Sequence, residues 1–81
     1  MKALHLTVVS PEKELFSGEV ERVTLPGTLG SFTILEHHAP IVSSLQAGKL
    51  TYVTLDGEEH TSEVQGGFME MSYDTLSVCV D

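Results

Sequence analysis

Four histidines are the candidate metal ligands of this chain, because neutral imidazole binds zinc and other transition metals. His37 and His38 are adjacent, so in an extended segment their side chains point to opposite sides and cannot share one ion. His5 and His60 fall on polar faces of expected strands, and no Cys or His pair stands at ligand spacing. The sequence therefore predicts no metal site and no cofactor.

The side chains that could act as nucleophile, acid or base are also isolated from one another. Cys79 stands between two valines without a neighbouring base, which indicates a structural thiol. The paired carboxylates fit a solvated strand face, where such spacing is common; these are Glu19 with Glu21 and Glu58 with Glu59. No nucleophile, base and orienting group can be assembled, so no catalytic residue is predicted.

Two loops are stronger candidates for binding than any of these residues are for catalysis. Gly27 and Gly30 precede a strand-like segment instead of a helix, so their spacing signals a turn and not a nucleotide loop. Leu29 lies inside that turn, where its side chain is expected to be exposed. The connections 26–31 and 36–40 are the most elaborate in the chain, and loops on a rigid sheet commonly carry binding function.

Length and composition indicate one small soluble domain covering residues 1–81. The chain has 81 residues, of which 41% are hydrophobic and 20% charged, values that disfavour disorder. No apolar run approaches the roughly 20 residues of a transmembrane helix, and the N-terminus lacks the pattern of a secretory signal. The single cysteine is consistent with a reducing compartment, so we expect a cytosolic protein without membrane insertion.

The net charge of −8 limits the possible partners. Such a charge repels a phosphate backbone and an anionic lipid surface, which excludes nucleic acid as the expected partner. The acidic residues are spread along the chain, so they form either an ordinary solvated surface or a dock for a basic partner.

Alternating apolar residues separated by turn signals predict short strands throughout, and no window has helical spacing. The expected strand segments are 3–9, 14–16, 19–25, 31–35, 41–45, 50–55, 58–64, 68–71 and 76–80. Asp56-Gly57 is the favoured pair for a two-residue hairpin turn. A three-residue step from Val20 to Val23 indicates a β-bulge or a change of sheet.

This pattern predicts an all-β fold, an antiparallel β-sandwich or flattened barrel of about nine to ten short strands. Several short motifs occur in order over nearly the whole chain: Val8-Val9-Ser10-Pro11-Glu12, Phe16-Ser17-Gly18, Leu25-Pro26-Gly27, His38-Ala39-Pro40, Ala47-Gly48 and Gly66-Gly67-Phe68-Met69-Glu70. The series resembles the N-terminal domain of the bacterial-type ε subunit of F-type ATP synthases. That resemblance implies two stacked sheets forming a flattened β-sandwich.

The resemblance also implies a mechanical role without bond chemistry or a small-molecule substrate. In the ε family the sandwich grips the γ subunit and rests on the c ring of the rotor, which couples ion translocation to ATP synthesis at the cytoplasmic face of the bacterial plasma membrane. By position, the implied c-ring contacts are Thr28, Leu29, Ser31 and Glu36. The implied γ contacts are Ser10, His38 and Ser43.

The chain departs from the family pattern in two places. Many members have an acidic residue at the position of Ser31 and a Pro-Gly pair at Glu36-His37, so we expect Glu36 to supply the acidic partner of a basic ring loop. The chain also stops at Asp81, where most bacterial relatives continue into two antiparallel helices. If the 81 residues are complete, the resemblance implies coupling without inhibition of ATP hydrolysis and without ATP sensing by such a helical hairpin.

An alternative from another functional class is a free-standing β-sandwich module that binds a carbohydrate or peptide. Such a module is expected to offer exposed aromatic platforms, yet the chain has no Trp and only Tyr52 and Tyr73. A small hydrolase ranks third. Co-purification with γ distinguishes the rotor subunit from both.

Overall fold

The computed structural model describes residues 4–81 and places them in six β-strands, with no helix among these residues. The strands are β1 (Leu4–Val9), β2 (Glu14–Gly27), β3 (Gly30–Leu35), β4 (Ile41–Thr54), β5 (Glu59–Ser72) and β6 (Thr75–Val80). The all-β prediction is confirmed, but the predicted count of nine to ten strands is wrong. The expected start of the first strand at Ala3 lies outside the described residues.

The error in the count comes from glycines that bend strands without ending them. Ser17-Gly18, Ala47-Gly48 and Gly66-Gly67 lie inside β2, β4 and β5, each of which continues for 14 residues. In β5, Gly66 and Gly67 have φ angles of 145° and 141°, which L side chains rarely adopt. Glycine is therefore needed for the bend itself.

Five of the strands close into a flattened barrel. The strand order is β1-β6-β5-β4-β2-β3, and β1 also pairs with β2, which joins the two ends of the five-stranded part. β3 continues the sheet beyond β2, and the pairing of β1 with β6 is parallel whereas the other described pairings are antiparallel.

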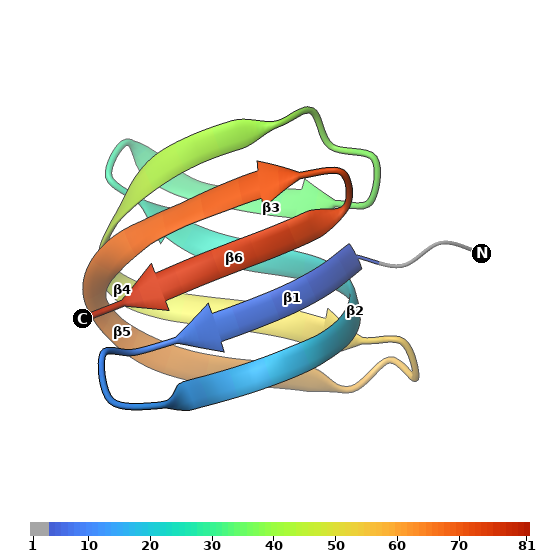
Figure 1. Cartoon of the computed structure of the whole chain (residues 1–81), viewed down its shortest axis with the longest axis horizontal. Helices are drawn as coiled ribbons and strands as arrows, with labels where there is room; N and C mark the ends of the chain where they lie inside the picture. Colours follow the sequence, from blue (N-terminus) through green and yellow to red (C-terminus); the bar gives the residue numbers. More distant parts are fainter. Residues whose placement is uncertain (1–3) are drawn as a thin grey trace.

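The barrel is flat enough to form two layers, as Figure 1 shows. The front layer contains the first half of β4, the second half of β5, β6, β1 and the first half of β2. The back layer contains β3, the second halves of β2 and β4, and the first half of β5. The three long strands therefore cross from one layer to the other.

The crossing of β2 occurs where the sequence predicted an irregularity. Val20 pairs with Leu4 of β1, whereas Arg22 pairs with Leu35 of β3, and the pairing with β4 shifts register between Val20 and Arg22. The predicted bulge or change of sheet at this step is confirmed.

All six strands contribute to one apolar core between the layers. Its buried members are Leu4, Leu6, Val8, Val20, Val23, Leu25, Ile34, Leu45, Leu50, Val64, Met69, Met71, Leu76, Val78 and Val80. No buried polar or charged residue lies among them in residues 4–81. The same part of the chain holds no helix of the length and hydropathy that a membrane crossing requires.

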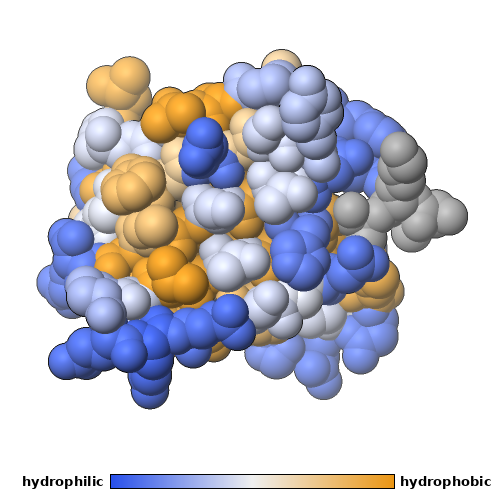
Figure 2. Space-filling view, in the orientation of Figure 1, coloured by the Kyte–Doolittle hydropathy of each residue, from blue (hydrophilic) through white to orange (hydrophobic). Residues whose placement is uncertain are grey.

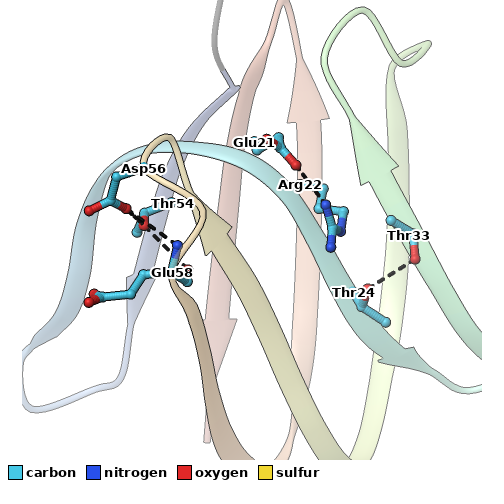
Figure 3. Close-up of polar contacts among 7 residues, drawn as sticks. All are labelled: Glu21, Arg22, Thr24, Thr33, Thr54, Asp56 and Glu58. Atoms are coloured by element: carbon cyan, nitrogen blue, oxygen red, sulfur yellow. Dashed lines mark hydrogen bonds and ion pairs between the residues drawn. The ribbon is translucent and has the colours of Figure 1, made fainter.

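The β4–β5 turn has three residues where the sequence predicted two. Gly57 N–H donates to the C=O of Thr54 at 2.9 Å, and Thr54 N–H donates to the C=O of Glu58 at 2.9 Å. Gly57, at φ 89°, is the third of these residues and forms a bulge. Asp56 accepts hydrogen bonds from the Thr54 hydroxyl and the Glu58 N–H, and these two donors lower the pKa of the Asp56 carboxyl (Figure 3).

Candidate partner-binding surfaces

The β2–β3 turn presents one aliphatic side chain to solvent. Gly27 pairs with Gly30, which leaves Thr28 and Leu29 as a two-residue loop. Thr28 N–H donates to the C=O of Ser44 on β4 at 3.2 Å, so the turn is attached to a neighbouring strand. Leu29 is fully exposed, as the sequence predicted. This turn therefore offers a fixed apolar tip to a partner.

The loop at the other end of β3 is also held in a defined shape. His38 N–H donates to the C=O of Leu35 at 3.3 Å, which closes a four-residue turn with Glu36 and His37 at its centre. His37 has φ 65°. His38 is exposed, whereas Glu36 is half-buried and its Oε2 is covered without a hydrogen-bond partner. Glu36 thus presents only part of its carboxylate to solvent.

The seven residues predicted to contact partners fall into three groups. Thr28, Leu29 and Ser31 share a shallow hollow with Ser43. Glu36 and His38 lie at the far end of β3, about 20 Å away for a six-residue strand at about 3.3 Å per residue. Ser10 lies at the end of β1, where its N–H donates to the C=O of Lys13 at 2.9 Å. The structure thus separates Glu36 from the other predicted c-ring contacts and separates Ser43 from Ser10.

An exposed apolar surface lies on the outer face of the front layer. Val42 is 71% exposed and Phe68 is 52% exposed. Ser44 is opposite Phe68 and Val42 is opposite Glu70, so Val42 and Phe68 are diagonal neighbours on one face. Phe68 is also opposite the half-buried Cys79 of β6. We call Val42, Phe68 and Cys79 the apolar patch.

The apolar patch reaches one of the predicted γ contacts. Ser10, Phe68 and Cys79 line one shallow hollow together with Val9 and Pro11. Figure 2 shows apolar side chains gathered over the left part of this face, with polar ones along its lower edge. Ser10 therefore lies beside an apolar area suited to a protein partner.

Sequence reasoning missed the patch because it interpreted 41–45 as a single apolar run. Ile41, Ser43 and Leu45 point toward the core, so Val42 points outward. The same alternation buries Met69 and exposes Phe68. A strict two-residue period counted from the core residues would have identified both outward-facing side chains.

The remaining polar side chains form small, separate contacts. Arg22 Nη1 lies 2.6 Å from Glu21 Oε1, and the hydroxyls of Thr24 and Thr33 are 3.0 Å apart between β2 and β3 (Figure 3). Among residues 4–81, no three His, Cys, Asp or Glu side chains gather closely enough to hold a metal ion. These contacts join neighbouring side chains on the strand faces.

The sequence matches a known protein family over nearly its whole length. The family model for the ATP synthase Delta/Epsilon chain β-sandwich domain matches residues 3–81. An ATP synthase epsilon chain of Afipia carboxidovorans is 46% identical over 81 residues, which are 100% of this chain and 59% of that protein. One of Caulobacter vibrioides is 40% identical over 81 residues, which are 93% of that protein.

Solved structures show the same fold at lower sequence identity. A chain in the cryo-EM structure of the Euglena gracilis mitochondrial ATP synthase (OSCP/F1/c-ring) superposes with a TM-score of 0.91 at 19% identity, covering 96% of this chain and 50% of that one. A chain of the Tetrahymena thermophila mitochondrial ATP synthase central stalk and c-ring gives a TM-score of 0.80 at 18% identity, covering 98% and 63%. The chain spans about three fifths of the length of the first relatives. On the family match, the fold and the relatives together, the chain belongs to the delta/epsilon chain β-sandwich family of ATP synthase.

Proposed function

We propose that this chain is a non-catalytic central-stalk subunit of an F-type ATP synthase, which links γ to the c ring and so couples ion translocation to ATP synthesis. Membership of the delta/epsilon family supports the complex. The relatives are bacterial, which supports a position at the cytoplasmic face of the plasma membrane as a peripheral part of F1.

One observation carries the linking role: a single closed sandwich exposes two separate apolar features. The apolar patch lies on the outer face of the front layer, whereas Leu29 projects from the β2–β3 turn of the back layer. The patch lies on β4, β5 and β6, and the turn that carries Leu29 joins β2 to β3 and is hydrogen-bonded to β4, so both belong to one continuous sheet. A body of this kind can hold two neighbours in a fixed relative orientation.

We assign the apolar patch to γ, together with the predicted contacts Ser10, His38 and Ser43. Phe68→Glu places a charge in the centre of the patch, and burying it against γ without a partner is expected to weaken binding by at least about tenfold. Leu55→Glu is the matched control, because Leu55 is 49% exposed and Phe68 52%, and Leu55 lies in the β4–β5 turn. Co-purification with γ measures both variants. Equal retention of γ by both variants would refute the assignment of the patch, whereas failure of the original chain to retain γ would favour a free-standing module.

We assign Thr28, Leu29, Ser31 and Glu36 to the c ring. Leu29→Asp is expected to reduce retention of the ring by the assembled complex without unfolding the chain, because Leu29 makes no core contact. Glu36→Lys is expected to weaken assembly at low salt and to have less effect at high salt, because salt screens the attraction between exposed charges. The effect should be small, since an exposed ion pair contributes only about 0–1 kcal/mol. Glu59→Lys changes the charge equally at an exposed position in β5 and is the control. A salt response shared by both charge variants would argue against a specific role for Glu36.

We also propose that residues 1–81 couple rotation without inhibiting ATP hydrolysis. The described residues are strands and turns and contain no helical hairpin that could enter a catalytic head. The test measures ATP hydrolysis by the assembled complex with and without this chain. Strong inhibition by the 81 residues would refute the proposal.

A further inference from the structure

We propose that Asp74 is a positioning residue that holds the loop 36–40 in its binding conformation by way of His37. Oδ1 of Asp74 accepts a hydrogen bond from the His37 N–H at 2.5 Å, and Oδ2 lies 3.4 Å from His37 Nδ1. One carboxylate therefore contacts both the backbone and the ring of a residue that is 37 positions away in sequence. The part of this inference that concerns partner binding depends on the proposed function, but the part that concerns the loop does not.

The loop needs an external support because of the conformation at its centre. His37 is the third residue of the turn closed by Leu35 and His38, and its φ of 65° lies in the left-handed region. A type II turn has positive φ at this third position and favours Pro and then Gly at its two central positions. Glu36 and His37 are neither, so the local sequence alone favours the turn only weakly.

Asp74 can supply that support because its own position is fixed. Tyr73 and Asp74, with φ values of 51° and 60°, form a two-residue turn between the paired Ser72 and Thr75. The C=O of Asp74 accepts a hydrogen bond from the N–H of His5 on β1 at 2.9 Å. The Asp74 side chain is only 19% exposed, and a charge-assisted hydrogen bond in such a place is stronger than a neutral one.

The shape of this turn determines how two predicted partner contacts are presented. Glu36 and His38 flank His37 directly, so the φ of His37 sets the relative direction of both side chains. Residues 37–40 also line a shallow hollow with Tyr73 and Asp74, which joins the loop to the β5–β6 turn. Asp74 acts on this surface through His37.

The first experiment measures the loop in the chain by itself. Amide hydrogen exchange at His37, followed by NMR, is expected to accelerate at least about tenfold in Asp74→Ala, which removes the acceptor. Asp74→Asn keeps an acceptor oxygen and is expected to show a smaller acceleration. A urea unfolding curve for each variant establishes that the sandwich remains folded. Exchange at His37 that is unchanged in a folded Asp74→Ala variant would overturn the inference.

The second experiment measures binding to γ and includes a rescue. Asp74→Ala is expected to weaken binding about tenfold, because the competent loop conformation becomes less populated. Adding His37→Gly to that variant restores a residue suited to positive φ, and the double variant is expected to bind within about threefold of the original chain. A double variant as weak as Asp74→Ala would overturn the positioning role. If the original chain does not bind γ at all, the proposed function fails, while the exchange measurement still decides the role of Asp74.

Discussion

Substitution of Gly67 by alanine tests whether the bend in β5 determines the fold. This residue pairs with Leu45 on one side and Val80 on the other, near the middle of β5, a strand that bends between the two layers in Figure 1. A Cβ atom there would lie 2.0 Å from the carbonyl oxygen of Cys79, whereas Cβ atoms essentially never approach within 3.0 Å. The strand β6 would have to retreat by about 1 Å.

The expected loss of stability has two parts. A non-glycine residue in this region of φ costs about 1–3 kcal/mol. Separation of β5 from β6 adds one or two disrupted backbone hydrogen bonds, at about 1–3 kcal/mol for each buried group left without a partner. We therefore expect Gly67→Ala to lower the free energy of unfolding by about 2–9 kcal/mol, a large share of the roughly 4–12 kcal/mol typical of a domain of this size.

Gly30→Ala is the matched control for this substitution. Gly30 has φ 132°, close to the 141° of Gly67, but a Cβ atom at Gly30 would meet nothing within 4 Å. The control therefore carries the backbone cost of about 1–3 kcal/mol without the clash. Urea unfolding followed by circular dichroism measures both variants. Free energies of unfolding that agree within about 1 kcal/mol would show that β6 tolerates the extra atom, contrary to the reasoning from the clash.

Three further predictions concern stability. Asp56→Asn removes a carboxyl whose folded-state pKa lies below its ordinary value of 3.8, so the original chain loses this contribution as the pH falls through the lowered pKa. The difference between the urea midpoints of the two proteins should become smaller as the pH falls from about 5 to below 3.8. Leu25→Ala, in the core, should cost about 2–5 kcal/mol, whereas Leu29→Ala should stay within about 0.5 kcal/mol; equal costs in urea unfolding would contradict the assigned burial. The rings of Phe16 and Tyr52 are 4.3 Å apart, and a double-mutant cycle should give a coupling of about 0.5–1.5 kcal/mol, with none if they act independently.

Local patterns predicted the parts of the fold in which one side of a strand faces the core. The alternations in 4–8 and 76–80 correspond to buried residues of β1 and β6. The glycine positions were also identified from the sequence. A glycine alone, however, does not show whether a strand bends or ends there, because both cases need a backbone conformation that other residues rarely adopt. Whether β5 continues past Gly66 and Gly67 depends on its pairing with β4 on both sides of the bend, which no local pattern encodes.

The candidate site was less predictable because it depends on contacts distant in sequence. Leu29 was recognised as exposed from its turn alone, and the structure agrees. Glu36 was expected to offer a free charge, but the surrounding fold covers one of its carboxylate oxygens. The contact between His37 and Asp74 arises only when the end of β3 meets the β5–β6 turn, so neither residue signals it locally.

The passage of β2, β4 and β5 through both layers has a mechanical consequence. In a stack of two independent sheets, a sideways force on one layer would be opposed mainly by dispersion contacts between side chains, each of which is weak. In this domain the same force acts on the covalent backbone of β2, β4 and β5, at the points where these strands bend from one layer to the other. Sliding would require several hydrogen-bonded ladders to come apart together, so the domain should deform as one solid block when it is twisted from opposite sides.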